Sequence, residues 1–466
     1  MSVESIHPEY DRYAEEWVKA RDTYEGETEV KRKTTVYLPA TDSMMMDGMN
    51  TGELGAQRYQ AYLTRAVFPD FVNEATDKMV SAMNQKEPSI ELPASMEYLR
   101  ENATVHGESL VSLLRRINFE QLLVGRVGLL PDFENETVQP QPRLAVYNAE
   151  TIRNWYAPSL KPLQFVVLDE SSDQVDPTTF EWDLQSKYRV LALREGRYSA
   201  AVAEESDEVA EGDFRDLSIR GKRLEYIPFT FINAADLTAA PGSIPMIGLA
   251  RLSLTIYRGE ADYRQHLFMQ GQDTLVIKGQ IEDDSDDDSV RVGARSVIPL
   301  EPDGDAKYIG VNGQGLAEQR NSLENDRKQA ESKTITFSAS AMNDAQSGEA
   351  LKTRIAAQTV SLVQIVQTGA GGMQKALRDI AEWMGESRES VVVTPHTDFK
   401  AIDFNSAELK ELMTSKNMGA PISEQSIHGL LVEKGFTKLT FDQEKELIDN
   451  ELGGLPSDNE LGGLFE

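Results

Sequence analysis

The strand-like stretch Ile227-Pro228-Phe229-Thr230-Phe231-Ile232-Asn233 opens the part of the chain that decides the fold. We expect it to be followed by a long helix (245–270) and a strand-rich segment with an acidic loop (271–312). A highly charged helix (313–334) and a polar loop (335–346) should come next. The polar loop leads into a very long helix that begins with Ser347-Gly348-Glu349-Ala350-Leu351-Lys352. Two helices that bracket a small β insert, followed by a loop and a third helix, suit a subunit that lines a channel better than one that closes around a pocket.

The charged helix over 313–334 has a very narrow apolar stripe. Leu316, Leu323 and Ala330 recur every seven residues, and nearly all the remaining positions are polar or small. An isolated helix of this kind is marginal in water, so we expect it to pack against its neighbour or against copies of itself. Basic and acidic side chains alternate along it: Arg320, Arg327, Lys328 and Lys333, with Glu318, Glu324, Asp326 and Glu331.

The last long helix is expected to run from Gly348 to about Gly385. At about 1.5 Å per residue it would span about 57 Å. Gly369, Gly371 and Gly372 lie inside it, and three glycines so close together predict a kink or a break.

The rest of the chain reads as helices first and strands afterwards. We expect helices over 9–23, 55–85 and 108–123, with the second one broken at Pro69, and then a buried strand over 126–132. Short alternating runs predict further strands over 143–147, 164–169, 188–194, 198–202, 226–232 and 391–393. Residues 405–450 return to short helices, one of them capped by Ser423. A Glu-Leu-Gly-Gly-Leu repeat, at 451–455 and 460–464, is read as a mobile tail or a docking peptide.

Composition restricts the class of protein. A chain of 466 residues can hold about three domain-sized pieces. It has no cysteine, which excludes disulfides and thiolate chemistry and fits a reducing cytoplasm. Met1–Tyr10 shows no secretory signal, and no run approaches the roughly 20 apolar residues that span a bilayer, so no membrane association is expected. The formal charge of −30 keeps the surface soluble and repels phosphate backbones.

No catalytic, cofactor or metal site is predicted. The five histidines, His7, His106, His266, His396 and His428, lack the spacing of metal ligands, and His396 near Asp398 reads as a surface turn rather than a dyad. The acidic run Asp283, Asp284, Asp286, Asp287 and Asp288 lacks the spaced ligands and terminal Glu of a calcium loop, so a solvated loop is favoured. The sequence therefore disfavours an enzyme.

In their order and spacing, these segments resemble the portal proteins of tailed bacteriophages over roughly residues 55–450. The pieces that carry the resemblance are the strand 227–229 with Asn233, the Tyr257…Ala261-Asp262-Tyr263 helix that runs into 274–279, the helix head 347–352, and Ile422-Ser423 with Glu444 and Glu446 further on. None of these pieces is specific alone.

The resemblance implies an α+β fold: a portal-like subunit with an α/β wing, two stem helices flanking a small β clip, a long wing-crossing helix and a short helical crown. Its implied parts are the wing (1–242), the first stem helix (243–270), the clip (271–312), the second stem helix (313–334) and the tunnel loop (335–346). The long helix with a returning wing strand (347–404), the crown (405–450) and an acidic tail (451–466) follow. Compared with the family, the crown is short and the clip is unusually acidic.

By the same resemblance, identical subunits form a ring of twelve at one capsid vertex of the virion, assembled in the host cytoplasm. The ring is the channel for genome packaging and ejection. Implied partners are non-specifically bound double-stranded DNA, terminase, a head–tail adaptor and the major capsid protein. The tunnel loop would present Ser338, Ser340, Met342 and Asn343 to DNA. Arg320, Arg327, Lys328 and Lys333 would line the channel, and the acidic run Asp283–Asp288 would face terminase and adaptor.

Two other readings stay open. An acidic cytoplasmic enzyme of the hydrolase kind would need a convergent polar pocket. Another virion structural or head-completion protein would lack the helix–clip–helix layout.

Overall fold

The computed structural model of the protein describes most of the chain, namely residues 2–133, 141–159, 161–204, 208–219, 221–270, 274–280, 300–309, 315–334, 348–397, 414, 416, 418, 423–433 and 439–452. The chain divides into two compact units, one of residues 1–337 and 345–399 and one of residues 338–344 and 400–466.

The first part of the larger unit is helical. Its helices are α1 (Pro8–Glu25), α2 (Glu27–Arg32), α3 (Asp42–Met46), α4 (Leu54–Arg65), α5 (Phe71–Met83) and α6 (Leu110–Leu123). The predicted break at Pro69 is confirmed, because α4 and α5 end and begin on either side of it. Ser109 caps α6 by accepting a hydrogen bond from the Ser112 backbone, and Gly125 follows the helix at φ +79°, a conformation that favours glycine.

Two antiparallel sheets follow the helices. A three-stranded sheet has the order β13-β2-β3 and a five-stranded sheet has the order β10-β9-β8-β5-β4. Their strands are β2 (Arg126–Asp132), β3 (Arg143–Asn148), β4 (Ile152–Tyr156), β5 (Phe165–Asp169), β8 (Lys187–Arg194), β9 (Arg197–Glu204), β10 (Arg215–Asp216) and β13 (Thr230–Asn233). Most of the predicted strands are confirmed. The strand expected over 226–232 is shorter and begins at Thr230, and β4 was not predicted.

Besides the β14–β15 hairpin described below, three two-stranded pairs are found in this unit. They are β1 (Ser89–Glu91) with β16 (Val392–Thr394), β6 (Ser172–Val175) with β7 (Trp182–Gln185), and β11 (Ser218–Ile219) with β12 (Lys222–Arg223). Together with the helices they confirm the α+β class.

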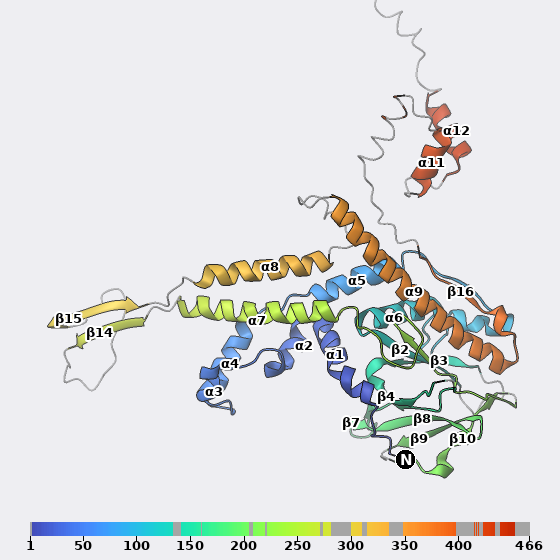
Figure 1. Ribbon diagram of the computed structural model, residues 1–466, viewed down its shortest axis with the longest axis horizontal. Coiled ribbons are helices and arrows are strands. Elements are labelled where there is room, and N and C mark those ends of the chain that lie inside the picture. The colour runs from blue at the N-terminus through green and yellow to red at the C-terminus, as the bar shows by residue number, and fades with distance from the viewer. Residues whose placement is uncertain are drawn as a thin grey trace, which may run out of the picture. The chain divides into compact units, whose positions relative to one another are not determined.

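A long helix, α9 (Gly348–Met384), packs on α6, β2 and β13 (Figure 1). A kink or a break was predicted at its glycines; the break is wrong, because α9 is one continuous helix. The glycines instead allow close approach. A Cβ on Gly369 would lie 2.5 Å from Gln121 Oε1, and one on Gly372 would lie 2.5 Å from Ile232 Cδ1. A missing side chain at a helix contact brings the neighbouring elements closer, and the helix needs no bend.

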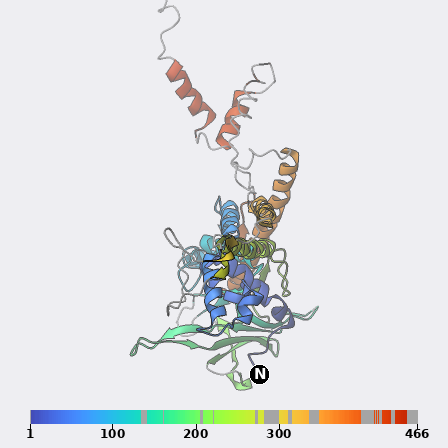
Figure 2. The ribbon, with the colours of Figure 1, turned by 90° about the vertical axis from the view of Figure 1, so that its left-hand side faces the viewer.

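Helices α7 (Ile247–Gln270) and α8 (Leu316–Thr334) lie side by side, with the hairpin of β14 (Thr274–Gln280) and β15 (Leu300–Ile309) between them in the chain (Figure 1). Figure 2 views this pair from its hairpin side. The helix, strand and helix expected over 245–270, 274–279 and 313–334 are confirmed. The smaller unit contains α11 (Glu424–Glu433) and α12 (Phe441–Leu452), and Ser423 caps α11 as predicted, its hydroxyl accepting from Ser426 N at 3.0 Å.

Candidate functional site: the paired helices α7 and α8

Helix α7 is anchored to the larger unit by one face. Its buried side chains include Leu249, Leu254, Ile256, Tyr257 and Ala261. Helix α4 lies on α7 and adds polar contacts: the Tyr62 hydroxyl donates to Asp262 at 2.6 Å, and Arg65 stacks over the Phe268 ring at 4.1 Å. Burial, followed by the hydrogen bond to the Asp262 carboxylate, raises the pKa of Tyr62, so the phenol stays protonated.

Helix α8 docks on α7 by its narrow stripe, as the sequence predicted. Leu323 and Ala330 are buried, while Leu316 is half-buried. Gly259 of α7 makes room for Leu323, because a Cβ at that glycine would lie 2.9 Å from Leu323 Cδ2. The two backbones therefore approach closely at this point.

One carboxylate joins the two helices. Glu260 of α7 is only 7% exposed, and its oxygens pair with Arg264 of the same helix at 2.7 Å and with Arg327 of α8 at 3.1 Å. Further along, His266 Nδ1 and Gln319 Oε1 are hydrogen-bonded at 3.0 Å. Later residues of α7 meet earlier residues of α8, so the pair is antiparallel. A buried carboxylate with two guanidinium partners fixes the register of this pair.

The structure separates the four basic residues that were predicted to line a channel. Arg327 is held by Glu260. Arg320 forms an exposed pair with Glu324 of its own helix at 3.7 Å. Lys328 is exposed, and Lys333 is exposed near the end of α8. Of the four, Arg320, Lys328 and Lys333 thus present charge at the surface, whereas Arg327 has a role between the helices.

Two other predicted groups lie outside the residues that the structure describes. They are the tunnel-loop residues Ser338, Ser340, Met342 and Asn343, and the acidic run Asp283, Asp284, Asp286, Asp287 and Asp288. The structure gives the elements on both sides of each group.

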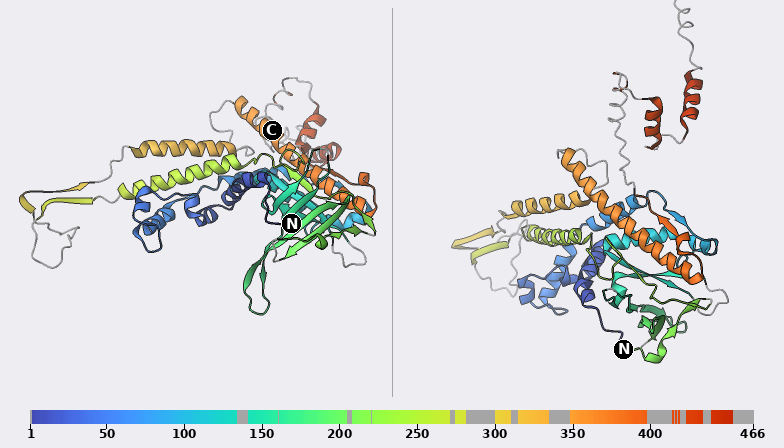
Figure 3. Two further views of the ribbon diagram at one scale, coloured as in Figure 1. Left: turned by 60° about the horizontal axis from the view of Figure 1, so that its bottom comes forward. Right: turned by 45° about the vertical axis from the view of Figure 1, so that its right-hand side comes forward.

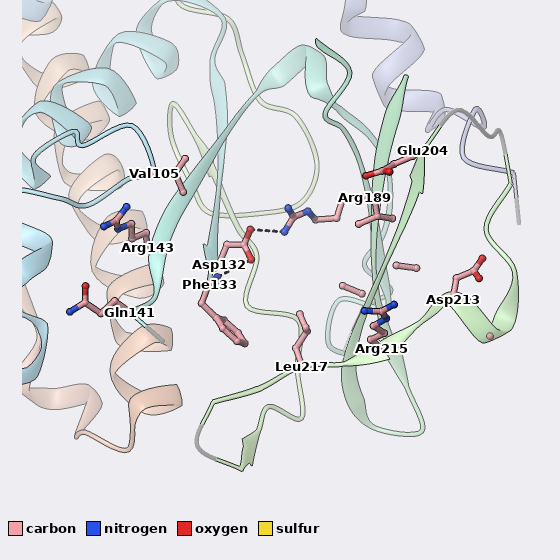
Figure 4. Close-up of a pocket in the computed structure, with 14 residues that line it drawn as sticks. Val105, Asp132, Phe133, Gln141, Arg143, Arg189, Glu204, Asp213, Arg215 and Leu217 are labelled. Carbon is pink, nitrogen blue, oxygen red and sulfur yellow. Dashed lines mark hydrogen bonds and ion pairs between the residues drawn. The ribbon is translucent and has the colours of Figure 1, made fainter. Parts of the chain in front are cut away.

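A cavity of about 870 Å³ lies against β2, β3, β8 and β9 (Figure 4). An enzyme would need a convergent polar pocket of this kind. Asp132 and Arg189 meet in it at 2.6 Å, as the dashed line in Figure 4 shows. The described residues that line it include no Ser, Thr, Lys, Tyr or His, so carboxylates are the nucleophiles or bases that this part of the lining offers. Its charged groups are Asp132, Arg143, Arg189, Glu204, Asp213 and Arg215.

Two further searches of the described residues were negative. No three or more His, Asp or Glu side chains among them are grouped so as to hold a metal ion. No helix among them is long and apolar enough to cross a membrane.

Comparison with known proteins gives distant likenesses. Residues 245–384, which run from the start of α7 to the end of α9, match a family described as a domain of unknown function (DUF4055). The match covers less than half of the chain. No curated protein matches the chain.

Two solved structures are similar to the chain at low identity. One is the neck of a native GTA (gene transfer agent) particle computed with C12 symmetry, at 13% identity and a TM-score of 0.38, covering 78% of this chain and 89% of that one. The other is the neck of an empty GTA particle computed with C6 symmetry, at 13% identity and a TM-score of 0.34, covering 78% and 90%. At TM-scores below 0.5, neither likeness carries a conclusion about this chain.

Sequence reasoning missed Glu260 as the residue that joins α7 and α8. The chain has 77 acidic residues, so one carboxylate in a helix gives no signal. The available signal was Gly259 beside it, because a glycine inside a long helix indicates either a break or a close contact.

Proposed function

We propose that the chain is the subunit of a phage portal: a ring of identical copies at one capsid vertex that forms the channel for packaging and ejecting the genome. One observation carries the proposal. Helices α7 and α8 form a packed antiparallel pair with the β14–β15 hairpin between them in the chain, and α8 leads into the long helix α9 through residues 335–347. The portal family, which the sequence resembles, has this order of parts.

The charge of the helix pair supports a conduit for DNA. Helix α8 carries four basic and four acidic side chains, and α7 carries three basic and two acidic ones. The chain as a whole has a net charge of −30. A nearly neutral helix pair in an acidic protein neither grips the phosphate backbone nor strongly repels it, which suits DNA that must slide.

In this proposal the subunit is passive. Terminase moves the DNA, and the hairpin end of the helix pair is where terminase and later the head–tail adaptor dock. Residues 335–346 form the tunnel loop, where Ser338, Ser340, Met342 and Asn343 contact the duplex without reading bases. Arg320, Lys328 and Lys333 face the channel, while Arg327 holds the pair together through Glu260.

The mass and symmetry of the purified full-length chain test the proposal. Native mass spectrometry combined with negative-stain class averages should give a closed ring of about twelve copies with a central hole. If the chain stays a monomer, the same measurement is repeated after co-expression with a major capsid protein. A compact dimer or tetramer without a channel in both preparations overturns the proposal and favours an enzyme or another virion protein.

The tunnel loop needs a separate test. We expect Asn343→Ala to form normal rings but to package or retain less DNA in a particle-assembly assay. Unchanged DNA content in particles with normal rings would contradict the assignment of this loop.

A further inference from the structure

Strands β6 and β7 form an arm, residues 172–185, that extends the two central strands of the five-stranded sheet. Strand β5 pairs with β8 as far as Asp169 with Tyr188, and the backbone of Glu170 then donates to Lys187 O at 2.7 Å. Pairing continues from Ser172 with Gln185 to Val175 with Trp182. Figure 3 shows the arm in its left-hand view as a narrow hairpin that stands away from the sheet. All residues from 172 to 186 are exposed.

The arm has one apolar face and one polar face. Directly paired residues of an antiparallel hairpin point to the same side, and so do residues two apart. The register therefore places Val175, Trp182 and Leu184 on one face, with Asp173. The other face is polar and consists of Ser172, Gln174, Asp183 and Gln185. Trp182 and Leu184 are each 68% exposed, and no residue that the structure describes covers them.

The tip of the arm adds a third large apolar side chain. Phe180 is 77% exposed and has φ +59°, a conformation that bulky residues rarely adopt. The turn is closed by backbone hydrogen bonds from Asp176 N to Glu181 O at 2.9 Å and from Phe180 N to Asp176 O at 2.8 Å. The turn thus presents the Phe180 ring to solvent.

An amphipathic hairpin whose apolar face is left exposed by the described residues favours a partner. A two-stranded hairpin is marginally stable in water without packing on its apolar face, and contiguous exposed apolar groups mark interaction sites. The arm also carries four carboxylates, on Asp173, Asp176, Glu181 and Asp183, and no Lys or Arg. Its partner should therefore combine apolar groups with basic ones.

The cavity against β2, β3, β8 and β9 has both features. Two of its lining residues, Val105 and Val202, are exposed large apolar side chains, at 60% and 43%. Within the described part of the chain, neither Arg143 nor Arg215 of its lining forms an ion pair, whereas Asp132 and Glu204 are paired with Arg189 and Lys187. Its volume of about 870 Å³ has room for more than one side chain.

We infer that the arm of one copy docks into this cavity of the next copy. Phe180 and Trp182 would meet Val105 and Val202, and the carboxylates of the arm would meet Arg143 and Arg215. The arm and the cavity are different surfaces, so the contact is heterologous and closes into a ring when the rotation between copies permits. This inference rests on the proposed function, because the copies would meet in the portal ring proposed above.

The fluorescence of the unmodified chain tests the burial of the arm. Of its four tryptophans, Trp17, Trp155 and Trp383 are at most 4% exposed and Trp182 is 68% exposed. Acrylamide quenching therefore reports on Trp182, and a Trp182→Phe variant gives the background. We expect the quenching of Trp182 to fall several-fold when monomers assemble. Unchanged quenching in an assembled ring overturns the inference and would mean that the arm binds a different partner.

Cross-linking tests where the arm goes, and the cysteine-free chain gives no background. The double variant Thr179→Cys with Val202→Cys, treated with a short bis-maleimide, should give a denaturing-gel ladder that continues beyond the dimer. Mixed single variants should stop at the dimer, which excludes a link within one chain. The control pair Thr179→Cys with Gln60→Cys, which moves the second thiol to exposed α4, should give no ladder.

The outcomes separate this inference from the proposed function. A ring with a channel but no ladder overturns the arm contact and leaves the portal proposal standing. A ladder without a closed ring supports the arm contact and counts against a portal. If neither a ladder nor a ring forms at protein concentrations up to the solubility limit, the arm contact is overturned as well.

Substitutions on the two faces of the arm provide the last check. Phe180→Gly removes the aromatic side chain, and glycine tolerates the positive φ at this position, so the turn itself should persist. We expect Phe180→Gly and Trp182→Ala to lower the ring fraction at least several-fold in native mass spectrometry, and Gln174→Ala on the polar face to leave it unchanged. Equal effects on both faces would contradict docking through the apolar face.

Discussion

Helices α8 and α9 are held in place by different forces. Helix α9 is packed by one broad apolar face over residues 362–384: Met373, Ala376, Leu377 and Ile380 are buried, and Gly369 and Gly372 bring it close to α6 and β13. Helix α8 is held by a narrow set of contacts, which includes Leu323, Ala330, the ion pair to Glu260 and the hydrogen bond between Gln319 and His266, and most of its other residues are exposed.

The difference shows how one chain separates stability from function. A helix held by apolar contacts over much of its surface cannot shift without opening the core. A helix held by a thin stripe and a few polar contacts leaves most of its surface exposed, where another copy or a duplex could bind. We expect substitutions to have their largest effects on α9 and their smallest on the outer face of α8.

The largest effect is expected when the close contact of α9 is filled. We expect Gly372→Val to lower the free energy of unfolding by about 3 kcal/mol, at the upper end for overpacking, because the new side chain meets Ile232 at 2.5 Å. Urea unfolding at fixed protein concentration measures this.

Gly371 is the matched control, because a Cβ there would meet nothing within 4 Å. Gly371→Ala should raise the free energy of unfolding by about 0.5–1 kcal/mol through helix propensity alone. If the two variants are equally stable, close packing does not explain the glycines of α9.

The next largest effect should come from the link between α7 and α8. We expect Glu260→Gln to lower stability by about 1–2 kcal/mol, because both charge-assisted hydrogen bonds weaken while the two arginines remain partly hydrated. The loss should appear as faster amide hydrogen exchange in α8, with α9 unchanged. Equal acceleration in both helices would mean that α8 does not move independently.

Two carboxylates of α9 predict opposite dependences on pH. Burial raises the pKa of Asp379, although Arg388 and Tyr226 partly oppose this effect. The folded chain therefore holds this proton more tightly than the unfolded chain. The stability that Asp379 contributes is present below its ordinary pKa of 3.8 and is lost as the pH rises through the higher folded value. We expect Asp379→Asn to gain stability relative to the parent chain as the pH rises from about 4 to 7. The gain in free energy of unfolding should be smaller than the loss caused by Glu260→Gln.

Glu382 is the control with the opposite sign. Burial pushes its pKa up, but hydrogen bonds from Arg388 and Tyr226 outweigh this effect and leave it lowered. Its contribution is present above the ordinary pKa and is lost as the pH falls through the folded value. Glu382→Gln should therefore lose stability relative to the parent chain as the pH rises through the lowered folded value to the ordinary pKa of 4.5, and should change little above that, whereas Asp379→Asn gains stability at higher pH. Urea midpoints at several pH values measure both, and parallel trends would contradict these assignments.

The smallest effect is expected on the outer face of α8. Arg320 and Glu324 are 60% and 56% exposed and lie 3.7 Å apart, so Arg320→Ala should change the free energy of unfolding by less than about 0.5 kcal/mol. A loss of packaged DNA in particles made with this stable variant would support a channel position. A loss of more than about 1 kcal/mol would mean that α8 is held from its outer side as well.

Strong local patterns predicted most of the elements. The break between α4 and α5 follows from Pro69, and the cap of α11 follows from Ser423. Helix α8 was recognisable from Leu316, Leu323 and Ala330, although nothing in these residues showed that Gly259 would receive Leu323. Such patterns act within a few turns of backbone, so the sequence alone can display them.

The arm was missed although residues 180–184 alternate between apolar and acidic side chains. Pro177 and the surrounding acids favour a loop over strands. The pairing of β6 with β7 continues a ladder that begins in β5 and β8, so the neighbouring sheet sets its register. An extended pairing of this kind depends on contacts that a local pattern does not contain.

By itself, the sequence determined where the long helices and most of the main strands form, because caps, prolines and apolar spacing act locally. Only the tertiary structure decided that the glycines of α9 are contact points rather than a break, that Arg327 is paired with Glu260, and that Val175, Trp182 and Leu184 share one exposed face of the arm. Each of these depends on which distant residue comes to lie opposite. Close packing and charge pairing fix that partner only when the whole unit has folded.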